Sequence, residues 1–253
     1  MNKLNKELKL KLPKAILFDT DNTLYDYHPA NKVAEEAVYQ KAKNLLGIKR
    51  DVFYNLYKQA KLDIKSNLHD TASSHSRLLY FQRLIELLGY KAQLLLALDF
   101  EQTFWRTFLD NAPLFPGVLE TLNYLKNIKI PIAIVTDLTS HIQLRKLTYF
   151  ELEDMFDAVV TSEEVGKDKP YKKNFLLVLN KLNLPENAYF WMIGDNPKAD
   201  IFGAKQLGAS TFQKIHNKVQ IGRGEFQPDY TFSEYSNFLS TIKDIIVTEK
   251  KIH

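Results

Sequence analysis

The segment Ala15–Leu24, with the sequence AILFDTDNTL, decides the fold of this chain. Its four leading apolar residues predict a short strand that is buried on both faces, as in a parallel sheet. The strand gives way to two acids, Asp19 and Asp21, with only Thr20 between them. Open parallel sheets bind ligands beyond the carboxyl ends of their strands, so this segment is a candidate site. The alternative is a purely structural turn, because Asp and Asn both favour turns.

Length and composition limit the class of protein. The chain has 253 residues, 45% of them hydrophobic and 25% charged, which predicts one large or two smaller globular domains. The formal net charge of +4 is spread along the chain and outlines no nucleic-acid surface. The lack of cysteine excludes disulfides, thiolate nucleophiles and zinc–thiolate sites. No apolar segment is long enough for a membrane span or follows the basic N-terminal segment as in a signal peptide. We therefore expect a cytoplasmic protein that binds neither membranes nor nucleic acid.

The region 25–111 has a helical pattern throughout. Its aromatic residues Phe104, Trp105 and Phe108 have helical spacing and are expected in the core of this region rather than on a substrate platform. Short links between the helices favour an antiparallel bundle. Four amphipathic helices are predicted, and they begin near Pro29, near Asp51, after a Ser73–Ser74 cap and near Ala92.

The rest of the chain alternates strands and helices. This alternation predicts a doubly wound parallel sheet with helices on both faces. One helix is expected to open at Lys169–Pro170, with the proline in its first position. A crossover between parallel strands needs about 30 residues, so the helical region is an insertion into the first crossover. Strands are predicted at about 130–135, 158–160, 188–193 and 209–212, with a short edge strand at 228–232.

These patterns predict two domains. Residues 1–24 and 112–253 form an α/β core with a Rossmann-like sheet, and residues 25–111 form a helical cap domain. Because the insertion leaves the core directly after the two acids, we expect it to act as a lid over them.

Polar residues follow three of the predicted strands, where the chain reaches one edge of the sheet. Asp19 and Asp21 follow the first strand, Thr136 ends the second, and Asp195 follows the fourth, with Asp200 nearby. Carboxylate oxygens without histidine or cysteine are the ligands that Mg²⁺ prefers. Asp19 and Asp195 are expected to bind the metal directly and Asp21 through its backbone carbonyl. Asp200 is expected to bind it through water or to orient Lys169.

The same residues suit phosphoryl transfer. The carboxylate of Asp19 can attack phosphorus to form an aspartyl-phosphate, and Asp21 can act as general acid and base. Lys169 would cancel negative charge and hold the phosphoryl group, because positioning and electrostatics are most of what this chemistry requires. The hydroxyl of Thr136 and nearby backbone N–H groups would bind the remaining phosphate oxygens.

Four segments together resemble the motifs of the haloacid dehalogenase-like hydrolases, and LFPGV at 114–118 resembles the return from that family's inserted cap. The resemblance implies a Mg²⁺-dependent phosphatase that acts on a small phosphorylated metabolite, such as a sugar phosphate, a nucleoside monophosphate or phosphoglycolate. It implies a phosphatase rather than a dehalogenase because dehalogenases lack the second acid, which is Asp21 here. The four segments are DTDNTL at 19–24, IAIVT at 132–136, GKDKP at 166–170 and GDNPKADI at 194–201.

Two alternatives stay open at this point. A phosphomutase of the same family uses the same two acids and a cap, and a non-catalytic module could bind phosphate on the same scaffold. The sequence also departs from the family at Asp137, where asparagine is common. A carboxylate there would repel a phosphate unless it turns toward solvent or toward the cap. We expect a monomer or a weak homodimer.

Specificity is expected to come from the cap. Besides Thr136, Asp137 and Lys169, the substrate-binding candidates are Tyr25 and Arg77, and Arg77 could clamp a second anionic group with two parallel hydrogen bonds. The alternative places Arg77 and its neighbour His75 on a solvated helix end, paired with acids. Further candidates are Tyr27, His28 and His69.

Overall fold

The computed structural model describes residues 1–216 and 219–250, and these form two compact units. The core unit contains Met1–Tyr25 and Leu114–His253, and the helical unit contains Asp26–Pro113. The sequence analysis set the corresponding boundaries after residues 24 and 111. Each unit is described by itself below.

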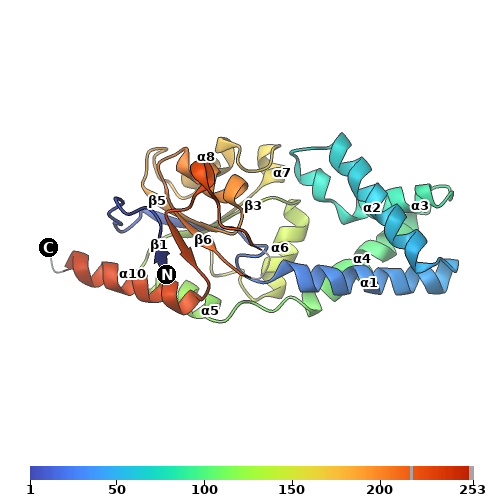
Figure 1. Cartoon of the computed structure of the whole chain (residues 1–253), viewed down its shortest axis with the longest axis horizontal. Coiled ribbons are helices and arrows are strands. Elements are labelled where there is room, and N and C mark those ends of the chain that lie inside the picture. The colour runs from blue at the N-terminus through green and yellow to red at the C-terminus, as the bar shows by residue number, and fades with distance from the viewer. Residues whose placement is uncertain (217–218, 251–253) are drawn as a thin grey trace. The chain divides into compact units, whose positions relative to one another are not determined.

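The core unit is built on a seven-stranded sheet with the order β1-β7-β6-β5-β2-β3-β4 (Figure 1). Neighbouring strands are parallel except β1 and β7, which are antiparallel. The sheet confirms the predicted doubly wound α/β fold. Its strands are β1 (Asn2–Lys3), β2 (Ala15–Phe18), β3 (Ile132–Thr136), β4 (Ala158–Thr161), β5 (Phe190–Gly194), β6 (Ser210–Lys214) and β7 (Tyr230–Phe232).

Strand β2 carries the AILF segment and lies between β5 and β3. All four of its residues have 0% exposure, as expected for a strand covered on both faces. Phe18 pairs with Ile134 of β3 and with Ile193 of β5, so the three strands end at the same edge of the sheet. Side chains that follow these strands therefore meet at this edge.

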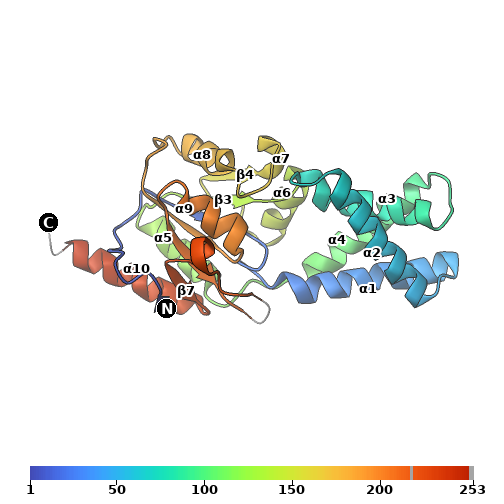
Figure 2. The same ribbon diagram turned by 45° about the horizontal axis from the view of Figure 1, so that its top comes forward.

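Helices cover both faces of the sheet. Helices α8 and α9 lie on one face and α5 and α10 on the other (Figures 1 and 2). On the α8 side, Leu17 and Val135 of the sheet belong to one buried cluster with Phe175 and Val178 of the helix. Burial of each such side chain contributes roughly 1.5–3 kcal/mol. The helices of this unit are α5 (Val118–Asn127), α6 (Ser140–Tyr149), α7 (Ser162–Val165), α8 (Lys172–Lys181), the π-helix η2 (Pro197–Phe202), α9 (Gly203–Lys205), the 3₁₀-helix η3 (Gly224–Phe226) and α10 (Tyr235–Lys250).

The predicted helix start at Lys169–Pro170 is wrong. Helix α8 begins at Lys172, and the peptide bond between Lys169 and Pro170 is cis. Lys169 instead belongs to a loop in which its backbone N–H donates to Asp137 and its side chain to Asp19. These two contacts hold the segment away from a helical path.

The predicted edge strand at 228–232 is a strand but not an edge. Strand β7 lies between β6 and β1, with Asn2 opposite Thr231. Strand β1 escaped prediction because its two residues sit in a charged segment without an apolar pattern.

The helical unit contains the four predicted helices. Helix α1 packs against α4, α3 packs against both α2 and α4, and buried Phe104, Trp105 and Phe108 confirm the expected aromatic core. The predicted N-cap of the third helix is wrong. Ser73 and Ser74 lie in a 3₁₀-helix, and Ser76 caps α3, with its Oγ accepting from Leu79 N at 3.3 Å. No helix in the described part of the chain is both long and apolar enough to cross a membrane. The elements are α1 (Tyr27–Leu46), α2 (Arg50–Asn67), η1 (Ala72–His75), α3 (Arg77–Leu87) and α4 (Leu94–Asp110).

Candidate active site

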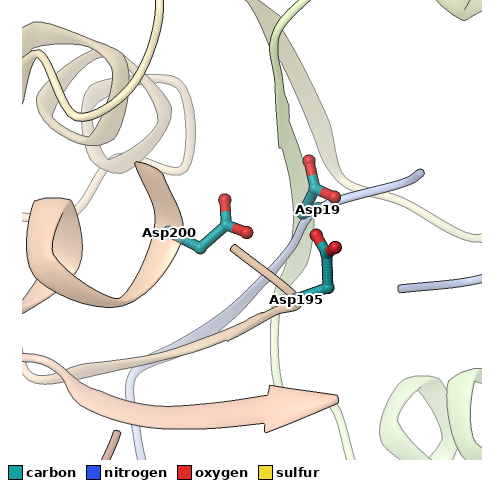
Figure 3. Close-up of side chains that lie close together, drawn as sticks. All are labelled: Asp19, Asp195 and Asp200. Atoms are coloured by element: carbon teal, nitrogen blue, oxygen red, sulfur yellow. The ribbon is translucent and has the colours of Figure 1, made fainter. Parts of the chain in front are cut away.

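Three carboxylates converge beyond the ends of β2 and β5. Asp19 follows β2, Asp195 follows β5, and Asp200 projects from η2 toward both (Figure 3). One oxygen from each lies within 4.8 Å of the others. This all-oxygen donor set fits Mg²⁺, which takes few carboxylates and keeps several waters. The structure therefore brings together three of the four predicted metal ligands.

Lys169 joins two of these acids. Its Nζ lies 2.7 Å from Asp19 Oδ1 and 2.7 Å from Asp200 Oδ1, and it also donates to the carbonyl of Val135 at 2.9 Å. Burial disfavours the charged ammonium, but Asp19, Asp200 and Asp137 outweigh this effect and hold the pKa of Lys169 well above its usual range. The ammonium is therefore a fixed positive charge.

Lys169 offsets only part of the cost of burying negative charge on these acids. Burial raises the pKa of Asp19 to about 7, against the lowering effect of Lys169. Burial also raises the pKa of Asp195 to about 8, and repulsion from Asp19 and Asp200 adds to the shift. A divalent cation among these carboxylates would favour their ionised forms, so the electrostatics of the site fit a metal.

The backbone at the end of β5 passes very close to the carboxylate of Asp200. Its Oδ2 accepts from the backbone N–H of Asn196 at 2.9 Å, and the Asn196 side chain caps the first turn of η2. A Cβ at Gly194 would lie 2.4 Å from the Asp200 carboxylate, so only glycine fits at the end of β5. The contact with Lys169 matches the orienting role expected for Asp200.

Asp21 lies on the outer side of this cluster. Its side chain is 35% exposed, and Lys146 Nζ lies 2.8 Å from its Oδ1. The hydroxyl of Tyr25 donates to the same oxygen. Tyr25 is 1% exposed and its ring packs against Phe150, and its predicted contact with substrate stays a prediction.

Thr136 ends β3 within a buried network. Its Oγ1 accepts from Gln143 Nε2 at 2.6 Å and lies 3.0 Å from Thr20 Oγ1. The predicted contact of Thr136 with phosphate stays a prediction. Sequence reasoning missed both Gln143 and Lys146. Their signal is that they share the buried stripe of α6 with apolar residues, although both are polar.

The carboxylate of Asp137 turns toward the loop that carries Lys169, and its predicted role in substrate binding stays a prediction. Its Oδ1 accepts from the backbone N–H of Lys169 at 2.8 Å, and its side chain is half-buried. Burial raises the pKa of Asp137 to about 7, although Lys169 opposes the shift. Asp137 therefore fixes the loop that delivers Lys169.

In the helical unit, Arg77 is the first residue of α3 and is half-buried. Its guanidinium donates to the carbonyl of His75 at 2.6 Å and to the hydroxyl of Tyr27. Its carbon also lies 5.2–5.9 Å from the ring centroids of four aromatic residues, which are Tyr27, Tyr80, Phe104 and Trp105.

Comparison with known proteins places this geometry in a family. The model of the haloacid dehalogenase-like hydrolases matches residues 13–208, which include all four motifs. The ribulose-1,5-bisphosphate 5-phosphatase of Halopiger xanaduensis is 38% identical over 198 residues, covering 78% of this chain and 82% of that protein. The glyceraldehyde 3-phosphate phosphatase of Methanopyrus kandleri is 28% identical over 246 residues, with 92% and 98% covered.

A solved structure shows the same fold. The hydrolase YfnB of Bacillus subtilis, in a crystal form bound to magnesium, aligns with a TM-score of 0.67 at 24% identity, covering 91% of this chain and 99% of that one. The family match, the relatives and the fold agree with one another. The chain is an enzyme of the haloacid dehalogenase-like hydrolase family.

Proposed function

We propose that this protein is a Mg²⁺-dependent phosphatase that hydrolyses a small phosphomonoester through an aspartyl-phosphate on Asp19. The observation that carries the proposal is the buried Lys169 ammonium, 2.7 Å from both Asp19 and Asp200, beside the metal-fitting group of acids. This arrangement combines a fixed nucleophile with a fixed positive charge. A bound Mg²⁺, as in the YfnB structure, would cancel the remaining negative charge and hold a phosphate oxygen.

In the first step, a carboxylate oxygen of Asp19 attacks phosphorus while the bond to the leaving alcohol breaks, and Asp21 gives that alcohol a proton. In the second step, Asp21 takes a proton from water as the water attacks phosphorus. The bond to Asp19 then breaks and inorganic phosphate leaves. Lys169 holds Asp19 in place through both steps and neutralises charge on the phosphoryl group.

The substrate class that the relatives support is a sugar phosphate. Ribulose 1,5-bisphosphate and glyceraldehyde 3-phosphate, which name two relatives, are both phosphorylated sugars. Arg77 has five N–H donors, and we propose that it binds a second anionic group of the substrate. Arg77→Lys should then raise the KM for a bisphosphate about 10-fold more than the KM for a monophosphate. An equal change for both substrates would assign Arg77 to the structure of the helical unit.

The central test measures phosphate release from nitrophenyl phosphate and from a panel of sugar phosphates, with Mg²⁺ and with a chelator. Asp19→Asn should lower kcat by about 10³-fold or more, and chelation should abolish activity. The exposed Asp244 of α10 offers a matched control, because Asp244→Asn removes the same charge far along the chain from the motifs. Activity that survives both Asp19→Asn and chelation contradicts the mechanism.

The same experiment separates the two alternatives. A phosphomutase would require a bisphosphate activator and release little phosphate. A binding module would be stabilised by inorganic phosphate against heat and would turn over no substrate on the panel.

A further inference from the structure

Two buried residues converge on the carboxylate of Asp21. The ammonium of Lys146, on α6, and the hydroxyl of Tyr25 both donate to its Oδ1. We infer that Lys146 and Tyr25 are positioning residues that fix the Asp21 carboxylate for proton transfer to the leaving group. This inference rests on the proposed function, in which Asp21 is the general acid and base.

The contrast in exposure explains why Asp21 needs anchors. Its side chain is 35% exposed, whereas that of Lys146 is 2% exposed. The backbone around Asp21 is a turn in which Leu24 N donates to Thr20 O at 2.8 Å, with Asn22 at a φ of 61°. The turn fixes the backbone of Asp21, and backbone geometry alone does not set the torsions of its side chain. A displacement of about 1 Å in a catalytic group can cost roughly 100-fold in rate.

Both anchors are themselves held rigidly. The ring of Tyr25 packs against that of Phe150, with centroids 4.9 Å apart. Lys146 Nζ lies 5.8 Å from the centroid of the Tyr25 ring, so the two residues that contact the Asp21 carboxylate also contact each other. Two donors on one oxygen define the direction of the carboxylate more strictly than one donor does.

The energetics favour a functional role for Lys146 over a stabilising one. Burying an ammonium costs free energy, and an apolar residue of similar length often serves stability as well or better. Replacing Lys146 leaves Asp21 partly exposed to water, so the variant retains no unpaired charge in the core. Lys146→Met should therefore fold. Tyr25→Phe keeps the ring packing and removes only the hydroxyl.

Leaving-group dependence tests the inference. Nitrophenolate leaves without a proton, whereas the alkoxide of an alkyl phosphate such as glycerol phosphate needs one. Lys146→Met and Tyr25→Phe should each lower kcat/KM, which reports the first step and not the hydrolysis of the aspartyl-phosphate, about 10- to 100-fold for the alkyl phosphate and about 3-fold or less for nitrophenyl phosphate. An equal loss on both substrates, or no loss on either, overturns the inference.

Double variants test whether both residues act through Asp21. In an Asp21→Asn background, neither Lys146→Met nor Tyr25→Phe should lower the rate further, because residues that act as a unit are not additive. A further loss in that background would mean that Lys146 or Tyr25 acts on the substrate directly, and it would overturn the inference.

Matched control residues lie on the sheet of the core unit. Lys214 of β6 is also buried, at 2% exposure, and Tyr230 of β7 is 6% exposed. Lys214→Met and Tyr230→Phe should not change the ratio of the two substrates' kcat/KM values. The same selective loss in these variants would show that burial alone, and not contact with Asp21, causes the effect.

Crystal structures of the two variants provide a readout that does not depend on turnover. If the wild-type protein hydrolyses none of the phosphates, the proposed function fails, and these structures still decide whether Asp21 is positioned by its neighbours. We expect the Asp21 side chain to adopt more than one conformer in Lys146→Met and in Tyr25→Phe. A single orientation identical to the wild type in both variants overturns the inference.

Discussion

Asp137 lies next to the proposed phosphate site and accepts one hydrogen bond from the backbone of Lys169. Its carboxylate accepts from the Lys169 backbone at 2.8 Å, and this bond requires an acceptor but no charge. We predict that Asp137→Asn keeps kcat/KM on an aryl phosphate within about 3-fold, because the amide oxygen can accept the same bond. Asp137→Leu removes the acceptor and should cost about 10-fold, the equivalent of one hydrogen bond. Equal losses in the two variants would show that the negative charge matters.

Gly194 is constrained by the carboxylate that follows it. The Cβ of an alanine would lie 2.4 Å from Asp200, which has to move to relieve the clash. Because Asp200 holds Lys169, we predict that Gly194→Ala lowers kcat by about 10- to 100-fold. Steady-state kinetics check this, with far-UV circular dichroism to confirm folding. Unchanged kinetics would mean that the position of Asp200 is not critical.

At the residue scale, the sequence identifies site residues that directly follow the end of a strand. Asp19 and Asp195 could be found because each follows an apolar segment, and the structure brings them together with Lys169. Lys146 and Gln143 could not be found in this way. They reach the site from the side of a helix. Lys146 contacts Asp21, 125 residues away in the sequence, and Gln143 contacts Thr20, 123 residues away, as well as Thr136. Their roles depend on tertiary packing that no local pattern encodes.

At the scale of elements, helix α4 carries the aromatic core of the helical unit. Phe104 is completely buried, and its ring contacts those of Phe81, Trp105 and Phe108. We predict that Phe104→Ala lowers the free energy of unfolding of this unit by about 3–5 kcal/mol, the cost of a large cavity. Hydrogen exchange of α4 peptides in the full chain measures the change.

Helix α4 also provides the control for this prediction. Leu95 is 83% exposed, so Leu95→Ala should change stability by less than about 0.5 kcal/mol. Equal protection of α4 in Phe104→Ala and in Leu95→Ala would mean that the aromatic core does not hold the unit together.

Element prediction succeeded where apolar periodicity was strong and failed where a tertiary contact decided the backbone. Strand β2 and the aromatic stripe of α4 follow directly from their sequences. The segment 197–205 forms the π-helix η2 followed by the short α9 rather than one regular α-helix, because both Asp200 N and Ile201 N donate to Asn196 O. That wider turn places Asp200 beside Lys169. This contact is tertiary, so helix propensity does not predict it.

At the scale of the whole molecule, the uncompensated acids link stability to pH. Burial is the main cause that raises the pKa of Asp195 from its ordinary value of 3.8 to about 8 in the fold. At a pH between these two values, Asp195 keeps its proton in the folded state and releases it in the unfolded state. The stability from this group is therefore complete below about pH 4 and is lost as the pH rises toward about 8. Bound Mg²⁺ would favour the ionised carboxylate and remove most of this loss.

We therefore predict that the metal-free protein loses more stability between about pH 4 and pH 8 than Asp195→Asn does, by on the order of 1–3 kcal/mol. Asparagine cannot ionise, so the difference between the two proteins isolates the contribution of Asp195 from those of all other titrating groups. Thermal unfolding of both proteins across this range, with chelator and then with saturating Mg²⁺, measures it. Parallel stability curves in chelator would show that Asp195 is ionised in the metal-free fold, and they would contradict the electrostatic basis for a metal at this site.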